Sequence, residues 1–129
     1  MTIEIIDLIP DSRWGVIFKD EGAWRAGLYR PEFTRHEDIT MMEKHTCPEL
    51  FVCIGGRTGL LLKNGVEERV VTLEQNQALM VTDYHNGFSI DPEGYFLVIE
   101  RTIFSTDYIN RSTGAFIKRV DVKPEGPVT

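Results

Sequence analysis

Turn signals recur through the whole sequence and leave only short runs of residues between them. The strongest are Pro10-Asp11, residues 19–22, Gly55-Gly56, Asn64-Gly65, Asn86-Gly87 and residues 91–94. Many of the intervals between them are about 5 to 9 residues long, which is the length of a β-strand. No stretch of about twelve residues shows a helical period of 3.6. The sequence therefore predicts a series of β-hairpins.

Aliphatic and aromatic residues fill these intervals, as is typical of strands. We expect strands at residues 2–9, 13–18, 23–29, 50–54, 57–63, 66–73, 78–81 and 95–101. Asn64-Gly65 is predicted to form a two-residue type I′ turn, because both residue types reach positive φ at low cost. The one helical candidate is a peripheral turn at 106–111 that Ser105 or Thr106 could cap. About ten short strands joined by short turns predict an all-β sandwich or double-sheet barrel.

The size and charge of the chain narrow the class of protein. Its 129 residues suffice for one hydrophobic core, so we expect a single domain, with a flexible tail at 123–129. A net charge of -6 disfavours nucleic acid and anionic membranes as partners. The longest apolar runs, 50–54 and 95–99, are too short to span a bilayer. The acidic N-terminus is unlike a secretory signal, and Cys47 and Cys53 match no redox or zinc spacing, so we expect a cytoplasmic protein.

The segment 41–56, M-M-E-K-H-T-C-P-E-L-F-V-C-I-G-G, contains the residue types that carry chemistry. If it is extended, its odd-numbered side chains share one face, including Glu43, His45 and Glu49. Phe51 on that face is typical of a core position, so the polar side chains would point inward, where they need a metal, a substrate or a proton. The alternative is that Pro48 breaks the alternation and leaves these residues in an exposed loop.

The same residues resemble a known family. The run His45-x3-Glu49-x6-Gly56 is similar to the second half of the first cupin motif, G-x5-H-x-H-x3,4-E-x6-G. The second cupin motif, G-x5-P-x-G-x2-H-x3-N, has a looser counterpart at residues 76–85, which ends at His85. The resemblance covers about residues 36–101. It implies a single-domain cupin jelly-roll barrel over residues 1–122, in which residues 1–35 extend the sheet or form the interface of a homodimer.

The resemblance also implies a set of metal ligands. His45, Glu49 and His85 stand at family ligand positions, and Glu43 stands where the first histidine would be. Two imidazoles and two carboxylates favour Fe, Mn or Zn as a divalent metal. The loss of one family histidine is also typical of cupins that bind no metal, so both possibilities stay open.

Two enzyme branches of the superfamily share further residues with this chain. Ureidoglycolate lyases resemble it in residues 42–45, M-E-K-H, and in the strand 96–101, F-L-V-I-E-R. The tryptophan that this likeness expects before the second-motif histidine is Tyr84 here. Sugar-nucleotide ketoisomerases resemble it in the His-x3-Glu run and in 107–109, D-Y-I, although the first histidine of motif one is missing. These likenesses imply a lyase or isomerase acting on a small polar anionic metabolite. The alternative is a non-catalytic cupin that binds or senses a ligand.

We expect Glu43 and His45 to transfer protons, and Arg57 and Tyr84 to contact the substrate. Arg57 follows Gly55-Gly56 close to the expected barrel mouth, where it could bind a carboxylate or phosphate. Arg25, Arg30 and Arg101 are weaker candidates for the same role. Trp14, Trp24 and Tyr29 are expected in the core or at a dimer interface, and His36, which has charged neighbours, on the surface.

Overall fold

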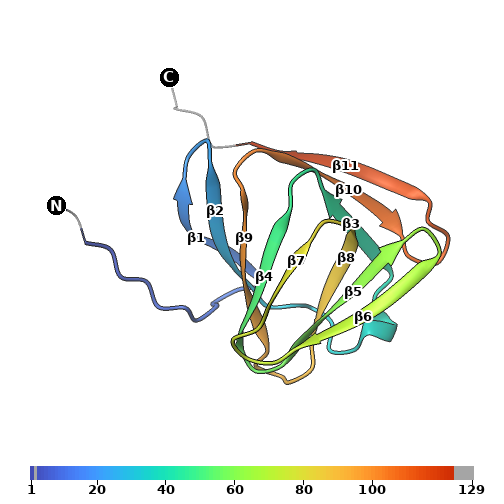
Figure 1. The fold of residues 1–129 in the computed structure, drawn as a ribbon, viewed down its shortest axis with the longest axis horizontal. Helices are drawn as coiled ribbons and strands as arrows, with labels where there is room; N and C mark the ends of the chain where they lie inside the picture. Colours follow the sequence, from blue (N-terminus) through green and yellow to red (C-terminus); the bar gives the residue numbers. More distant parts are fainter. Residues whose placement is uncertain (2, 124–129) are drawn as a thin grey trace.

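The computed structural model describes residues 1 and 3–123, which form two antiparallel β-sheets facing each other (Figure 1). The five-stranded sheet has the order β1 (Trp14–Asp20), β2 (Trp24–Tyr29), β9 (Tyr95–Arg101), β4 (Glu49–Gly55) and β7 (Ala78–Val81). The six-stranded sheet has the order β11 (Phe116–Val122), β10 (Phe104–Asn110), β3 (Met41–His45), β8 (Tyr84–Ser89), β5 (Thr58–Asn64) and β6 (Glu67–Leu73). A 3-10 helix, η1 (His36–Asp38), precedes β3. The predicted all-β jelly-roll architecture is confirmed.

No helix in the described part of the chain is long and apolar enough to cross a membrane.

The hydrophobic core occupies one end of the space between the sheets. Its buried members come from both sheets and are Phe51, Cys53, Leu60, Leu73, Val81, Phe96 and Val98. A second cluster covers the other face of the six-stranded sheet and consists of Ile39, Met42, Leu61, Phe88 and Ile109. The alternation of side chains along β3 explains this division, because Met42 points to the second cluster while Glu43 and His45 point between the sheets. The other end of the space between the sheets holds these polar side chains together with aromatic ones such as Phe104.

Several predicted elements differ from the observed ones. The strand expected at 2–9 is wrong, since residues 3–10 form neither strand nor helix and run as an extended arm (Figure 1). The helical turn expected at 106–111 is also wrong, because most of this segment belongs to β10, which pairs with β3 and β11. The predicted flexible tail at 123–129 lies outside the described residues, except for Lys123.

The turn predicted at Asn86-Gly87 is a strand interior, in the middle of β8. Gly87 is needed there because a Cβ at this position would lie 2.9 Å from the Tyr29 ring. The Asn86 side chain links β8 to β3, since its amide donates to the Met41 carbonyl at 2.8 Å, and its oxygen accepts from the Gly87 N–H at 2.9 Å. Asn86-Gly87, although typical of turns, therefore lies inside β8, where the glycine leaves room for the Tyr29 ring.

The hairpin of β5 and β6 lies where the sequence predicts it, but its turn is one residue later. Asn64 pairs with Glu67, so the two loop residues are Gly65 and Val66. Gly65 has a φ of 62°, and Val66 is not among the described non-glycine residues with positive φ. Positive φ at the first loop position alone is typical of a type II′ turn, not type I′.

Candidate functional site

A cavity of about 320 Å³ lies between the sheets at the end that the core leaves free. The five-stranded sheet lines it with side chains that include Arg25, Tyr29 and Glu100, and the six-stranded sheet with Glu43, His45 and others. Both sheets contribute an edge strand, β1 through Trp14 and β11 through Val122. The cavity is therefore bordered by the same end of each sheet.

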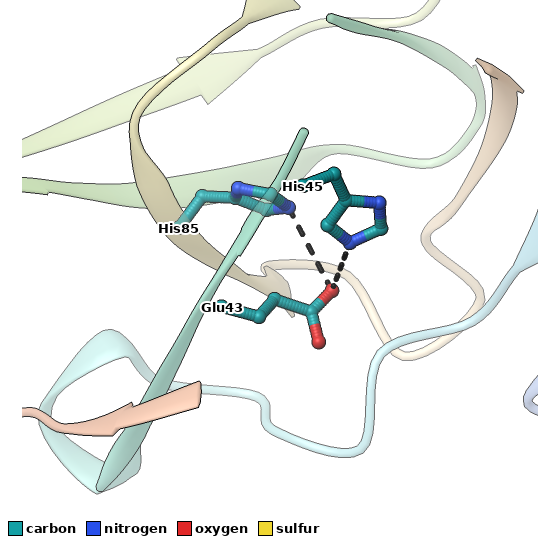
Figure 2. Close-up of side chains that lie close together, drawn as sticks. All are labelled: Glu43, His45 and His85. Carbon is teal, nitrogen blue, oxygen red and sulfur yellow. Dashed lines mark hydrogen bonds and ion pairs between the residues drawn. The ribbon is translucent and has the colours of Figure 1, made fainter. Parts of the chain in front are cut away.

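Glu43 and His45 line this cavity, and the buried His85, which is not in the described lining, lies next to them (Figure 2). Glu43 Oε1 lies 3.3 Å from His45 Nε2 and 3.7 Å from His85 Nε2. The opposite ring nitrogen of His85, Nδ1, lies 3.0 Å from the Asp83 carbonyl, which fixes the orientation of the ring. The imidazole of His45 stacks on Phe104 with ring centroids 4.8 Å apart. Nitrogen atoms of both rings thus face one carboxylate oxygen.

Glu49 reaches the same cluster from the opposite sheet. Its Oε1 lies 3.1 Å from His85 Nε2 and 3.2 Å from His45 Nδ1. The chain changes sheets between His45, the last residue of β3, and Glu49, the first of β4, and Pro48 lies in this crossing. Pro48 does break the strand, but the polar residues stay inside the barrel instead of forming an exposed loop. The four residues converge because β3 and β4 face each other, rather than because they share one face of a single strand.

Glu100 and Arg25 extend the cluster along the five-stranded sheet. They are cross-strand neighbours of β9 and β2. Arg25 Nε and Nη2 both donate to Glu100 Oε1, at 3.1 and 2.9 Å, while Glu100 Oε2 lies 3.3 Å from His45 Nδ1. The ring of His45 therefore has carboxylates next to both of its nitrogens.

Burial and charge shift the pKa values of these groups in different directions. Burial lowers the pKa of His45, but its contacts with Glu100 and Glu43 outweigh burial and raise the pKa to about 10. The pKa of His85 is likewise raised, because Glu49 and Glu43 outweigh the effect of burial. Burial raises the pKa of Glu49, whereas the pKa of Glu100 is lowered because His45 and Arg25 outweigh its burial. The carboxylates of the cluster thus stabilise positive charge on the two histidines.

The donor atoms of the cluster fit a metal ion. Glu43, His45 and His85 each offer one atom, and these atoms lie within 4.8 Å of one another. Four buried atoms of the cluster lack a hydrogen bond of acceptable angle, namely His45 Nδ1, Glu49 Oε1, His85 Nε2 and Glu100 Oε2. Each of them nevertheless lies within 3.3 Å of another of the four as an ion pair. Imidazole and carboxylate are suitable ligands for Zn, Fe and Mn.

Two of the expected substrate contacts lie elsewhere. Arg57 is exposed and binds Asp91, with Nη2 3.0 Å from Oδ1, and it does not belong to the described lining of the cavity. Gly56, with φ 59°, makes the turn that brings the Arg57 N–H and guanidinium to Asp91. Tyr84 is also absent from the described lining, and the ammonium of Lys44 lies 5.7 Å from the centre of its ring.

The structure adds site residues that the sequence does not single out, above all Glu100, and places Trp14, Arg25 and Tyr29 in the lining. The sequence does contain a signal for Arg25 and Glu100 as site residues, because each is a charged residue inside an otherwise apolar strand segment. Tyr29 is predicted in the core, and its hydroxyl donates to Asn86 Oδ1 at 3.3 Å at the cavity wall. The sequence does not reveal which charged residue pairs with which, since that depends on strand order.

Comparisons with solved structures find the same architecture. A cupin-2 domain containing protein from Shewanella frigidimarina NCIMB 400 matches with a TM-score of 0.54 and 14% identity, over 70% of this chain and 83% of that chain. Hydroxypropylphosphonic acid epoxidase from S. wedmorenis, in complex with fosfomycin, matches with a TM-score of 0.58 and 11% identity, over 78% of this chain and 58% of that chain. Protein NMB1881 from Neisseria meningitidis matches with a TM-score of 0.53 and 15% identity, over 76% of this chain and 98% of that chain.

A structure of HppE with Co(II) and substrate matches with a TM-score of 0.57 and 11% identity, over 75% of this chain and 57% of that chain. No protein-family model matches the sequence, and no curated protein matches it. At these identities the likeness concerns the arrangement of the strands.

Proposed function

The chain has the cupin fold, and from this premise we propose that its cavity is the metal-binding active site of a small-molecule enzyme. The reaction is of the lyase or isomerase kind, and the substrate is a small polar anionic metabolite. The observation that carries this proposal is the convergence of Glu43, His45 and the buried His85, whose donor atoms lie within 4.8 Å of one another beside the cavity.

Charge balance supports a divalent cation at this point. Glu43, Glu49 and Glu100 surround the two histidines, and Arg25 is the one arginine or lysine in the described lining. Three buried or half-buried carboxylates against one guanidinium leave two negative charges, and without a metal these are balanced by protons on His45 and His85, whose pKa values are raised. A divalent ion would carry the same two positive charges in place of those protons.

The metal would be held by Glu43, His45 and His85, with Glu49 adjacent to both rings. Bound there, it would polarise an oxygen of the substrate as a Lewis acid. Glu100 would accept a hydrogen bond from His45 Nδ1, which leaves Nε2 free to act as a ligand. Glu49 is suited to hold and release a proton, because burial raises the pKa of its carboxyl toward the working range of a general acid or base. HppE, which has the same fold, has been solved with Co(II).

A second candidate is an acid–base enzyme without metal, because His45 has a carboxylate next to each ring nitrogen. Contacts of this kind favour a doubly protonated imidazolium, which cannot bind a metal. In that case the Glu43–His45 pair would move the proton. A third is a binding or sensing module in which the same cavity holds a ligand without turnover.

The test is elemental analysis of the purified protein, followed by calorimetric titration of chelator-treated protein with Mn, Fe(II) and Zn. We expect about one site per chain, with proton release because the cation displaces protons from the histidines. His85→Gln should weaken metal binding by at least about tenfold. His36→Gln is the matched control, since His36 pairs with Glu37 on η1, away from the cavity. Activity that survives a strong chelator, in protein free of metal, would contradict the metal and favour the Glu43–His45 pair.

Turnover is tested with a panel of keto acids, ureido acids and sugar phosphates. Conversion of one of these by the wild type, and its loss in His45→Ala, would support an enzyme. Saturable binding of several compounds without any product would favour the binding module.

We also propose that the protein is located in the cytoplasm. Cys47 and Cys53 are both free and buried, as is common in reducing compartments.

A further inference from the structure

The guanidinium of Arg25 lies over two aromatic rings of the cavity. The guanidinium carbon lies 5.6 Å from the centre of the Trp14 ring and 5.2 Å from the centre of the Phe104 ring. Gly27 makes the position of Trp14 possible, since a Cβ at residue 27 would lie 2.4 Å from the indole. The side chain of Arg25 keeps 19% of its surface exposed. Cation–π contacts with two rings thus hold the guanidinium in place while part of it stays accessible.

One edge of the guanidinium has no partner. Nε and Nη2 both donate to a single atom, Glu100 Oε1, so this is not the usual two-oxygen pairing. Among the described residues, nothing accepts a hydrogen bond from Arg25 Nη1. A guanidinium has five N–H donors, and Arg25 lines the cavity, so its remaining donors are available to a ligand there.

We propose that Arg25 recognises the anionic group of the ligand and that this group is a carboxylate. The proposal rests on the proposed function for the reacting end of the ligand. Glu100 bridges the two ends, because its Oε1 accepts from Arg25 and its Oε2 lies 3.3 Å from His45 Nδ1. The distance between Arg25 and the His45 cluster is therefore spanned by one carboxylate. A ligand that reaches both must carry its anionic group only a few atoms from the group that reacts.

The charge of the site favours a monoanion over a dianion. Arg25 already shares its positive charge with Glu100, and Glu43 and Glu49 face the same cavity. A phosphate dianion would add twice the repulsion that a carboxylate adds. The guanidinium fork matches both carboxylate and phosphate, so the charge of the site decides between them. A cavity of about 320 Å³, near the lower end for ligand sites, suits a small hydroxy or keto acid.

The experiment compares glycolate, its uncharged amide glycolamide, and inorganic phosphate by calorimetric titration of the full chain. Glycolate should bind wild-type protein at millimolar concentration, more tightly than phosphate. Arg25→Gln should weaken glycolate binding by about tenfold or more, the effect of losing charge-assisted hydrogen bonds. Glycolamide binding should be absent or unchanged by this substitution. Arg119→Gln is the matched control, because Arg119 also pairs with a carboxylate, Asp107, but outside the cavity.

Arg25→Lys keeps the positive charge next to Glu100, and it tests the role of Arg25 in glycolate binding if Arg25→Gln does not fold. It should also weaken glycolate binding, because an ammonium lacks the planar pair of donors. Equal glycolate affinity in wild type and Arg25→Lys, tighter binding of phosphate, or no binding of glycolate would each overturn the inference. Metal content is measured in every variant. If the protein contains no metal and still binds glycolate through Arg25, the proposed metal site is refuted and this inference is supported. If the protein contains metal but its glycolate affinity is the same in the Arg25 variants, only this inference is overturned.

Discussion

His45 connects the two halves of the site, because carboxylates from both sheets lie next to its ring. Glu43 lies next to Nε2, and Glu49 and Glu100 lie next to Nδ1. Phe104 stacks on its face and limits rotation of the ring. The imidazole is therefore positioned by contacts on its edges and on its face.

The raised pKa of His45 predicts how stability depends on pH in metal-free protein. The folded pKa is about 10, above the ordinary value of 6.5. The stabilising effect of the protonated ring is therefore fully present below about pH 6.5 and is lost as the pH rises through about 10. We expect the free energy of unfolding, measured by urea denaturation with a chelator present, to fall across this window.

His45→Gln is the control for this prediction and should flatten the fall. Saturating divalent metal should also flatten it in the wild type, because the cation replaces the protons as the source of positive charge. An identical decline in wild type and His45→Gln would show that another group causes it.

Sequence motifs identify Glu43, His45, Glu49 and His85 because their types and spacing are unusual for a strand interior. The structure brings these four together. Arg57 is a different case, since proximity to a glycine turn does not determine where a long side chain points. Asp91, which lies 34 positions further along the chain, determines its position. Contacts over such separations depend on the fold and are not visible in a local pattern.

At the scale of elements, Gly65 offers a clean test of turn geometry. Its φ is 62°, and a Cβ built there meets no atom within 4 Å, so any cost of substitution comes from the backbone. Gly65→Ala should lower the free energy of unfolding by about 1–2 kcal/mol. Gly65→Asn should cost about as much, because the first loop position of a type II′ turn lies outside the left-handed helical region that asparagine tolerates.

Thermal or chemical unfolding of the two variants measures the difference. A much smaller loss in Gly65→Asn than in Gly65→Ala would show that residue 65 adopts the left-handed conformation of a type I′ turn instead.

The strands that composition alone identifies are the apolar ones, such as β7 and β9, whose bounds match the expected ranges. β10 was not predicted because F-S-T-D-Y-I-N contains polar residues that also favour turns and helix caps. Its strand conformation is imposed by β3 and β11 on its two sides. Phe104, Thr106 and Tyr108 alternate into the cavity, so the polar residues of β10 belong to the site.

At the scale of the whole molecule, the N-terminal arm has side chains typical of a strand but no partner strand among the described residues. Ile3, Ile5 and Ile9 are exposed by 75% or more. The expected homodimer would explain them, since an edge strand of a second copy could pair with the arm. We predict that the chain sediments as a dimer in analytical ultracentrifugation.

Ile5→Lys combined with Ile9→Lys should convert that dimer to a monomer. Val66→Lys is the control, because Val66 is 99% exposed in the β5–β6 turn and far along the chain from the arm. A wild-type chain that is monomeric at micromolar concentration would rule out this role for the arm.

The crossing between β3 and β4 also has a mechanical consequence. Glu49 belongs to one sheet, while the two histidines that it contacts belong to the other. Shear of one sheet over the other would separate these atoms before it disturbs the hydrogen bonds within either sheet. The contacts of the site therefore oppose sliding of one sheet over the other, and a bound molecule that contacts both sheets would oppose it further.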